Sequence, residues 1–156
     1  MAAALFAFRR AVRMARRNLR RYEIAERSME PALLPGDWVV AVPWRQPRRG
    51  DVVVVQHPYR PEFDLVKRVV GLPGETIVVD PDGHVLLGGH RGLDGWGRGR
   101  TGPAKEWDVP SDCVFLLGDA REVSRDDSRT LGPIPVGGID WQIRFRYWPR
   151  GRIGLI

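Results

Sequence analysis

The chemistry of this chain centres on Lys67. It lies in the run 64–70, whose alternating β-branched residues predict a strand that ends at a Gly-Leu-Pro-Gly turn. On a strand, Lys67 would share one face with Leu65 and Val69. Of the 25 basic residues only Lys67 and Lys105 are lysines, and a buried lysine, unlike arginine, can lose its proton. Lys67 is therefore either a general base or an edge-strand residue that discourages aggregation.

A serine, Ser28, follows the basic N-terminal segment. A serine hydroxyl becomes a nucleophile when a neighbouring base removes its proton. Lysine can be that base only if desolvation lowers its pKa by several units from about 10.4. Such a Ser–Lys pair is a known variant of the serine-hydrolase triad. The two residue types therefore indicate acyl-transfer chemistry if the fold brings them together.

A dense polar loop, residues 120–135, follows an apolar run that ends in Gly-Asp. Ser124 or Ser128 would hydrogen-bond the lysine amine, while Asp127 and Arg129 would pair and fix the loop. The simpler interpretation is a surface turn with exposed charges, since exposed ion pairs are common and weak. From the residues alone both interpretations stand.

Composition indicates one globular domain. The chain has 156 residues, of which 43% are hydrophobic and 28% charged. The net charge of +6 is local, because residues 1–22 carry seven arginines and no acid, and the rest has 18 basic against 19 acidic residues. A lone cysteine, Cys113, excludes an intramolecular disulfide. The sequence contains no apolar run of about 18 residues, so no transmembrane helix is predicted.

Residues 1–26 are predicted to form a basic amphipathic helix. Apolar residues recur at spacings of three and four between Leu5 and Tyr22, and arginines fill most of the remaining surface. We interpret this segment as an anchor on an anionic membrane surface. Docking on its own domain comes second and nucleic-acid binding third, because the stripe contains Leu, Phe and Val.

The remainder, residues 27–156, is predicted to be mainly β, with several short antiparallel strands. A Gly-rich loop or insertion occupies residues 88–108. His84 and His90 lie near this loop but lack the ligand spacing of a zinc site, so neither a metal nor a cofactor is predicted. The expected strands are 38–42, 51–55, 64–70, 76–79, 84–87, 113–117 and 139–147.

Several separate motifs follow one another along the chain. They are Ser28-Met29-Glu30-Pro31 with Gly36-Asp37, Lys67 to Glu75, Gly118-Asp119, Ser124 and Asp127-Ser128-Arg129. In this order they resemble the boxes of type I signal peptidases, and the resemblance runs from about residue 27 to the end of the chain. The compact size is similar to that of the mitochondrial inner membrane protease and its bacterial relatives, and of the peptidase that matures nickel superoxide dismutase.

The resemblance implies a serine endopeptidase of mainly β fold that cleaves signal or leader peptides after a small residue through an acyl-enzyme. The implied partner is a precursor protein with a cleavable leader. The implied roles are nucleophile for Ser28, general base for Lys67, orientation of the lysine for Ser124, support for Asp127 and Arg129, and substrate binding for Met29.

Three departures from the family pattern matter. Glu26 stands two residues before Ser28, where the family often has a serine or glycine that completes the oxyanion hole. We expect Glu26 to point away, or the hole to rely on the backbone. Ala120 replaces an asparagine, and one inserted residue leaves Asp126 and Asp127 as candidates for the family aspartate. We prefer Asp127, which adjoins Ser128-Arg129.

The third departure is the membrane anchor, because the family's spanning helix is replaced by the arginine-rich segment. We therefore expect membrane association without a spanning helix, with the side of the membrane open and the cytoplasmic side allowed. Two other functions remain. One is a dedicated maturation peptidase for a single partner, and the other is a non-catalytic β module tethered to anionic lipid or RNA.

Overall fold

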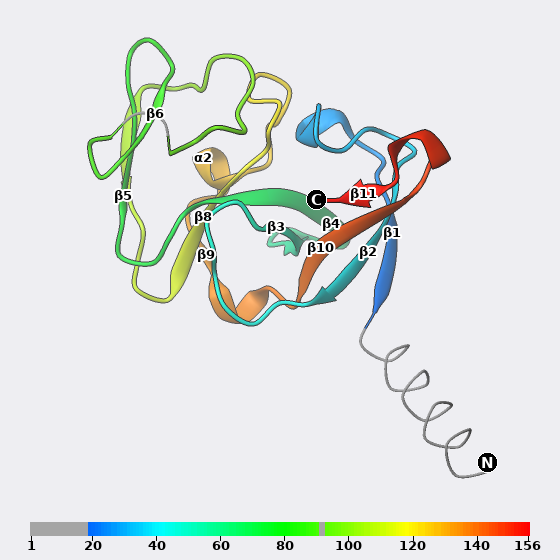
Figure 1. The fold of residues 1–156 in the computed structure, drawn as a ribbon. Coiled ribbons are helices and arrows are strands. Elements are labelled where there is room, and N and C mark those ends of the chain that lie inside the picture. The colour runs from blue at the N-terminus through cyan, green and yellow to red at the C-terminus, as the bar shows by residue number, and fades with distance from the viewer. Residues whose placement is uncertain (1–18, 91–92) are drawn as a thin grey trace, which may run out of the picture.

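Strand β4, Arg60–Gly71, carries Lys67 and lies in the middle of the fold (Figure 1). The computed structural model describes residues 19–90 and 93–156. β4 pairs antiparallel with β3, Val52–His57, and its last residues pair with β8, Cys113–Leu117. The predicted alternation is confirmed, since Leu65 and Val69 join one apolar cluster and Val66 packs on another.

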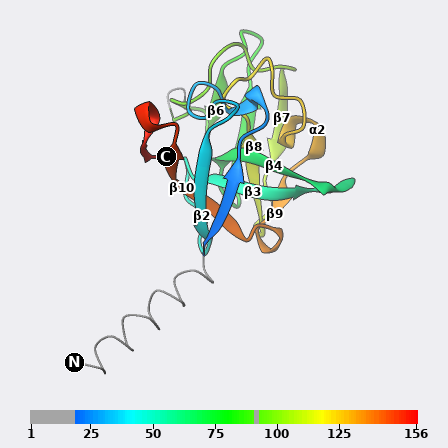
Figure 2. The same ribbon diagram turned by 90° about the vertical axis from the view of Figure 1, so that its right-hand side faces the viewer.

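The main sheet has eight described strands in the order β1-β2-β10-β3-β4-β8-β9, with β11 paired to β10. All of its strand pairs are antiparallel. The sheet curls strongly (Figures 1 and 2) and has apolar clusters on both faces, since Val52 and Val54 of β3 belong to one cluster and Val53 and Val55 to another. Its remaining strands are β1 (Arg20–Glu23), β2 (Trp38–Pro43), β9 (Ile134–Pro135), β10 (Trp141–Trp148) and β11 (Gly154–Leu155).

A second, three-stranded sheet has the order β6-β5-β7 and lies to one side of the main sheet (Figure 1). Its β5, Thr76–Val79, and β6, Val85–Leu87, form the predicted hairpin around a Pro-Asp-Gly turn. The prediction of a loop over 88–108 is wrong at its end, because β7, Lys105–Asp108, pairs with β5. Trp107 anchors this strand by packing on Phe115 in a shared apolar cluster.

Helical segments are short within the described residues. They are η1 (Arg27–Met29), α2 (Ser128–Leu131), η2 (Val136–Gly138) and η3 (Arg150–Arg152). The prediction of a mainly β fold is confirmed. In the part of the chain that the structure describes, no helix combines the length and the hydropathy needed to cross a bilayer.

The helix predicted over residues 1–26 is wrong where it can be checked. Residues 1–18 lie outside the described residues, but Arg20–Glu23 forms strand β1 and pairs with β2. Tyr22 packs against the core, and the Arg20 guanidinium lies 4.7 Å from the centre of the Trp141 ring. Backbone pairing and these contacts outweigh the helical spacing, which is a weak local preference.

Candidate active site

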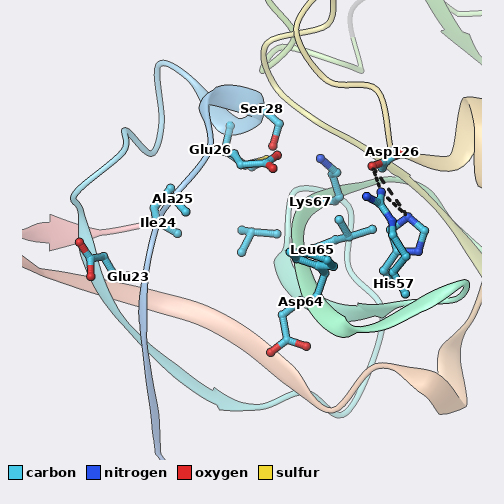
Figure 3. Close-up of a pocket in the computed structure, with 14 residues that line it drawn as sticks. Glu23, Ile24, Ala25, Glu26, Ser28, His57, Asp64, Leu65, Lys67 and Asp126 are labelled. Atoms are coloured by element: carbon cyan, nitrogen blue, oxygen red, sulfur yellow. Dashed lines mark hydrogen bonds and ion pairs between the residues drawn. The ribbon is translucent and has the colours of Figure 1, made fainter.

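Ser28 lies in the short helix η1, at one side of a pocket of about 240 Å³ (Figure 3). Its neighbour Met29 is 1% exposed and packs in the main core, which fixes the backbone at Ser28. The Ala120 amide donates a hydrogen bond of 3.0 Å to the Ser28 carbonyl oxygen. The segment after β8 therefore holds the serine in place.

Lys67 reaches the same pocket from β4 and is 3% exposed (Figure 3). The predicted candidates Ser28 and Lys67 thus come together, with both side chains directed into the pocket. Among the described residues the Lys67 amine donates no hydrogen bond, and none joins it to Ser28. Hydrogen bonds of catalytic groups are often long in the free enzyme and shorten when substrate binds.

Burial lowers the pKa of Lys67 below its ordinary value of 10.5. The negative charges of Asp127, Glu26 and Asp126 act in the opposite direction, and the nearby Arg129 guanidinium adds to the lowering. Desolvation is the largest of these influences because an ammonium loses its hydration shell inside the protein. The neutral amine, which is the form that can accept a proton, is therefore favoured relative to an exposed lysine.

Behind Lys67, three of the predicted residues form one hydrogen-bonded group. The Ser124 hydroxyl donates to Asp127 Oδ2 at 2.8 Å. Arg129 donates to both Asp127 oxygens, at 2.9 and 2.8 Å, and to the Ser124 carbonyl at 2.6 Å. Asp127 also caps α2 by accepting from the Arg129 amide. Ser128 has another role, since its hydroxyl accepts from the Leu116 amide and ties α2 to β8.

Gly118 allows this group to pack closely. A Cβ atom at this position would overlap the Ser124 side chain and lie 2.6 Å from the Ser28 carbonyl oxygen. Only glycine leaves room for the backbone just after β8 to lie against both Ser124 and the Ser28 carbonyl. This contact gives a physical reason for the Gly in the Gly118-Asp119 motif.

The two adjacent aspartates have different surroundings. Asp127 is 1% exposed and pairs with Arg129. Asp126 lines the pocket, pairs with Arg60 at 2.6 Å, and lies 3.8 Å from the buried His57 ring (Figure 3). Arg129 thus pairs with Asp127, the residue that we preferred from the sequence because it adjoins Ser128-Arg129.

One ion pair beside the site was not anticipated from the sequence. Arg68 donates to Asp119 through two nitrogens, at 2.8 and 2.6 Å, and to the Gly50 carbonyl at 2.8 Å. Both side chains are buried. Strand alternation turns Arg68 away from the face that carries Lys67. No local pattern in the sequence marks this pair, because Arg68 and Asp119 are 51 residues apart.

Glu26 does not point away from the pocket. It precedes η1, lines the pocket, and extends its carboxylate toward the interior beside Ser28 (Figure 3). Its negative charge raises the pKa of Lys67. We expected either that Glu26 points away or that the oxyanion hole relies on backbone donors. Because Glu26 faces the pocket, the second expectation remains.

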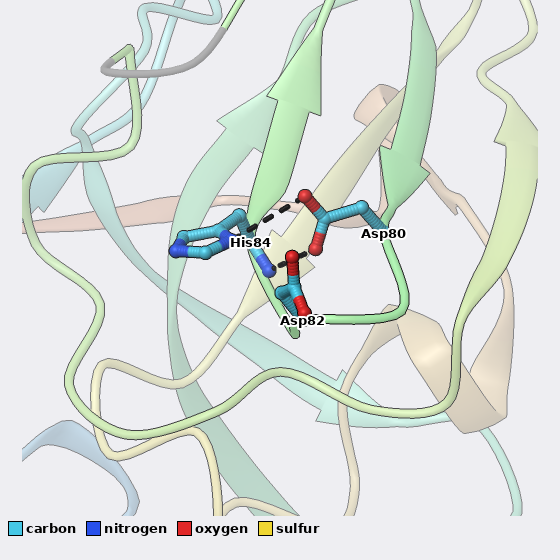
Figure 4. A group of neighbouring side chains, drawn as sticks. All are labelled: Asp80, Asp82 and His84. Carbon is cyan, nitrogen blue, oxygen red and sulfur yellow. Dashed lines mark hydrogen bonds and ion pairs between the residues drawn. The ribbon is translucent and has the colours of Figure 1, made fainter.

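A group with metal-ligand atoms lies elsewhere, on the turn between β5 and β6. Ligand atoms of Asp80, Asp82 and His84 lie within 4.8 Å of one another (Figure 4). The His84 amide and ring both contact Asp80, at 2.9 and 3.3 Å. Because Asp82 and His84 are exposed and these bonds close the turn, the group is explained by turn geometry. His90 is not part of it.

Comparisons with known proteins agree with this architecture. The chain is 34% identical over 129 residues to the mitochondrial ATP-independent inner membrane protease subunit 1b of Arabidopsis thaliana, covering 78% of this chain and 66% of that protein. It is 34% identical over 147 residues to signal peptidase I of Leptolyngbya laminosa, covering 84% and 70%. The chain thus spans about two thirds of the length of these relatives.

The fold is similar to the crystal structure of a signal peptidase I from Enterococcus faecalis. The TM-score is 0.52 at 24% identity, and the match covers 61% of this chain and 94% of that chain. The family model described as signal peptidase, peptidase S26, matches residues 1–148. This chain therefore belongs to the peptidase S26 signal peptidase family.

Proposed function

We propose that the chain is a serine endopeptidase that removes signal or leader peptides after a small residue, with Ser28 as nucleophile and Lys67 as general base. The observation that carries this proposal is the pair itself. A serine hydroxyl and a buried lysine, whose pKa is lowered by burial, face one pocket from opposite sides. A lysine without a hydrogen-bond acceptor is a poor structural element but a suitable base.

The reaction would begin when neutral Lys67 takes the proton of the Ser28 hydroxyl as its oxygen attacks the scissile carbonyl. The Ser28 backbone amide would be one donor to the oxyanion, a role worth about 3 kcal/mol in the transition state. The Lys67 ammonium then returns its proton to the leaving amine, which leaves an acyl-enzyme on Ser28. Lys67 next deprotonates a water molecule that hydrolyses the ester and frees the serine.

The supporting residues have distinct roles in this scheme. Ser124 and Asp127 form the polar floor beneath the lysine, and Arg129 holds that floor rigid through its bonds to Asp127 and to the Ser124 carbonyl. Met29 would contribute apolar surface on the pocket side of Ser28, where it lies next to the core. Among the described residues the amine forms no hydrogen bond with this floor. Asp127 would therefore act on it through its charge, and Ser124 would meet it only when the site tightens around a substrate.

The fold also leaves room for an extended substrate. On one side of the pocket lies β1 with the segment that follows it, and β1 is the last of the described strands at that edge of the sheet. On the other side lies the part of β4 before Arg68, where pairing with β8 begins. Free strand edges bind extended peptides through main-chain hydrogen bonds. A leader peptide would lie between these two edges.

Membrane attachment forms part of the proposal. The relatives include proteins named for the mitochondrial inner membrane. Residues 1–18 of this chain hold five arginines and no acid, so this segment would bind anionic lipid headgroups. The substrate would be a precursor whose leader reaches the same surface.

Two substitutions test the catalytic pair. Ser28→Ala and Lys67→Met should each lower cleavage of a leader peptide with a small-residue junction by at least about a thousandfold. Methionine preserves most of the lysine volume, so thermal unfolding should show that both variants remain folded. Full activity in either folded variant would exclude the Ser–Lys mechanism. A dedicated single-partner peptidase would ignore this generic leader and cleave only its own precursor.

A further inference from the structure

Three carboxylates around the pocket form no ion pair with the residues that the structure describes. Glu23, Glu26 and Asp64 line the pocket and are exposed, and within the described ranges none of them forms an ion pair. Asp126, which also lines it, is paired with Arg60. We call Glu23, Glu26 and Asp64 the acidic rim.

We propose that the acidic rim selects leader peptides with a basic side chain close to the cleavage site, an inference that rests on the proposed peptidase function. Among the described residues that line the pocket, the arginine and lysine side chains are those of Arg60 and Lys67. Arg60 is neutralised by Asp126, and Lys67 is buried. The mouth therefore carries an excess of negative charge, and a cleft lined by one sign of charge concentrates ligands of the opposite sign.

The spacing of the rim fits a peptide better than a metal ion. In residues 19–90 and 93–156, the group whose ligand atoms come within 4.8 Å of one another is the one on the β5–β6 turn, and no rim residue belongs to it. Carboxylates that are spread along a groove instead match the long, flexible side chains of lysine and arginine on an extended chain.

The placement of the rim residues around the pocket indicates how each would act on the substrate. The Glu26 carboxylate lies beside Ser28, whereas the Glu23 and Asp64 carboxylates are directed away from Ser28 and Lys67 at the outside of the pocket (Figure 3). An extended peptide advances about 3.3 Å per residue. Glu26 would therefore contact a side chain adjacent to the scissile bond, and Glu23 and Asp64 would act on the substrate through their charge alone, from a greater distance.

The test uses peptides that share one small-residue junction and carry Lys, Gln or Glu at a single flanking position, scanned on both sides. For the wild-type protein at about 50 mM salt we expect kcat/KM to be about tenfold higher for the best Lys peptide than for its Glu counterpart. The preference should shrink at about 0.5 M salt, where screening shortens the reach of exposed charges.

Three variants locate the effect. Glu26→Gln should reduce the Lys-over-Glu ratio to about twofold, and Glu26→Lys should reverse it. Glu106→Gln, an exposed glutamate on β7 outside the pocket, should leave the ratio unchanged. We compare the ratio of kcat/KM for the Lys and Glu peptides because both peptides react with the same Lys67. Any effect of a substitution on the general base therefore cancels in the ratio.

Binding to the Ser28→Ala variant provides a second measurement, because fluorescence polarisation reports affinity without turnover. Equal kcat/KM and equal affinity for the three peptides would overturn the role of the rim while leaving the peptidase proposal intact. A preference that survives in the Glu23→Gln/Glu26→Gln/Asp64→Asn variant would also overturn it. Charge-selective binding without any cleavage by the wild-type protein would instead contradict the proposed function and retain the rim.

Discussion

The two sides of Lys67 differ in how their polar groups are satisfied. Behind the lysine, Ser124, Asp127 and Arg129 are largely buried and bonded to one another. In front of it, the carboxylates of the acidic rim are exposed and unpaired in the described part of the chain. Buried polar groups must be paired to be tolerated, whereas exposed ones are free to meet a ligand. We therefore assign stability and positioning to the first side and recognition to the second.

The largest effect should come from the adjacent aspartates, which belong to opposite sides. Asp127→Asn leaves the Arg129 guanidinium, 8% exposed, without its charge partner, and should lower the free energy of unfolding by about 3 kcal/mol. Asp126→Asn removes an ion pair in which both side chains are about half exposed, and should cost less than about 1 kcal/mol. Chemical denaturation measures both. Equal losses would remove the distinction between the two sides.

Gly118→Ala tests the packing of the buried side. The added methyl group would overlap Ser124 and approach the Ser28 carbonyl, so we expect a loss of about 2 kcal/mol in unfolding free energy together with a large loss of activity. Gly137→Ala is the matched control, since a Cβ there meets no heavy atom within 4 Å. A folded, fully active Gly118→Ala protein would show that this close contact is not needed.

The smallest effect concerns the rim and the pH dependence of cleavage. The base must be neutral, so activity should rise with pH through the pKa of Lys67, which burial holds below 10.5. Because the charge of Glu26 raises that pKa, Glu26→Gln should move the rising limb to lower pH. Its unfolding free energy should stay within about 0.5 kcal/mol of wild type. If the rising limb of the pH–activity profile moved to higher pH, or if the protein clearly lost stability, Glu26 would instead belong to the buried group that positions Lys67.

Local sequence patterns were enough to predict strand β4 and the β5–β6 hairpin. The β-branched run around Lys67 predicted a strand, and the two-residue period of a strand then predicted which residues share a face of β4. The Pro-Asp-Gly turn predicted the β5–β6 hairpin for the same local reason. Spacing could not predict that Arg20–Glu23 would pair with β2, since strand partners distant in sequence are not encoded in local spacing.

The site shows the same division. Lys67 was recognisable from its apolar neighbours, and ordered motifs pointed to Ser28 and to the loop behind the lysine. Composition and spacing had no means to show that Asp119 binds Arg68, or that Glu26 faces the pocket, because both depend on how segments far apart in the chain approach one another. β7 was missed because glycines around it conceal a strand of only four residues, Lys105–Asp108.

The buried Arg68–Asp119 pair has a consequence for how β4 finds its register. A slip of one residue would exchange the two faces of the strand. In one direction Arg68 would take the position of Lys67 in the pocket, and in the other Lys67 would take the position of Arg68 beside Asp119. The apolar residues on both faces would still be buried, so hydrophobic burial alone resists this slip weakly. The two-pronged bond from Arg68 to Asp119 does resist it, because a lysine offers a single point of contact. A permanently charged neighbour thus ensures that the titratable amine faces the serine.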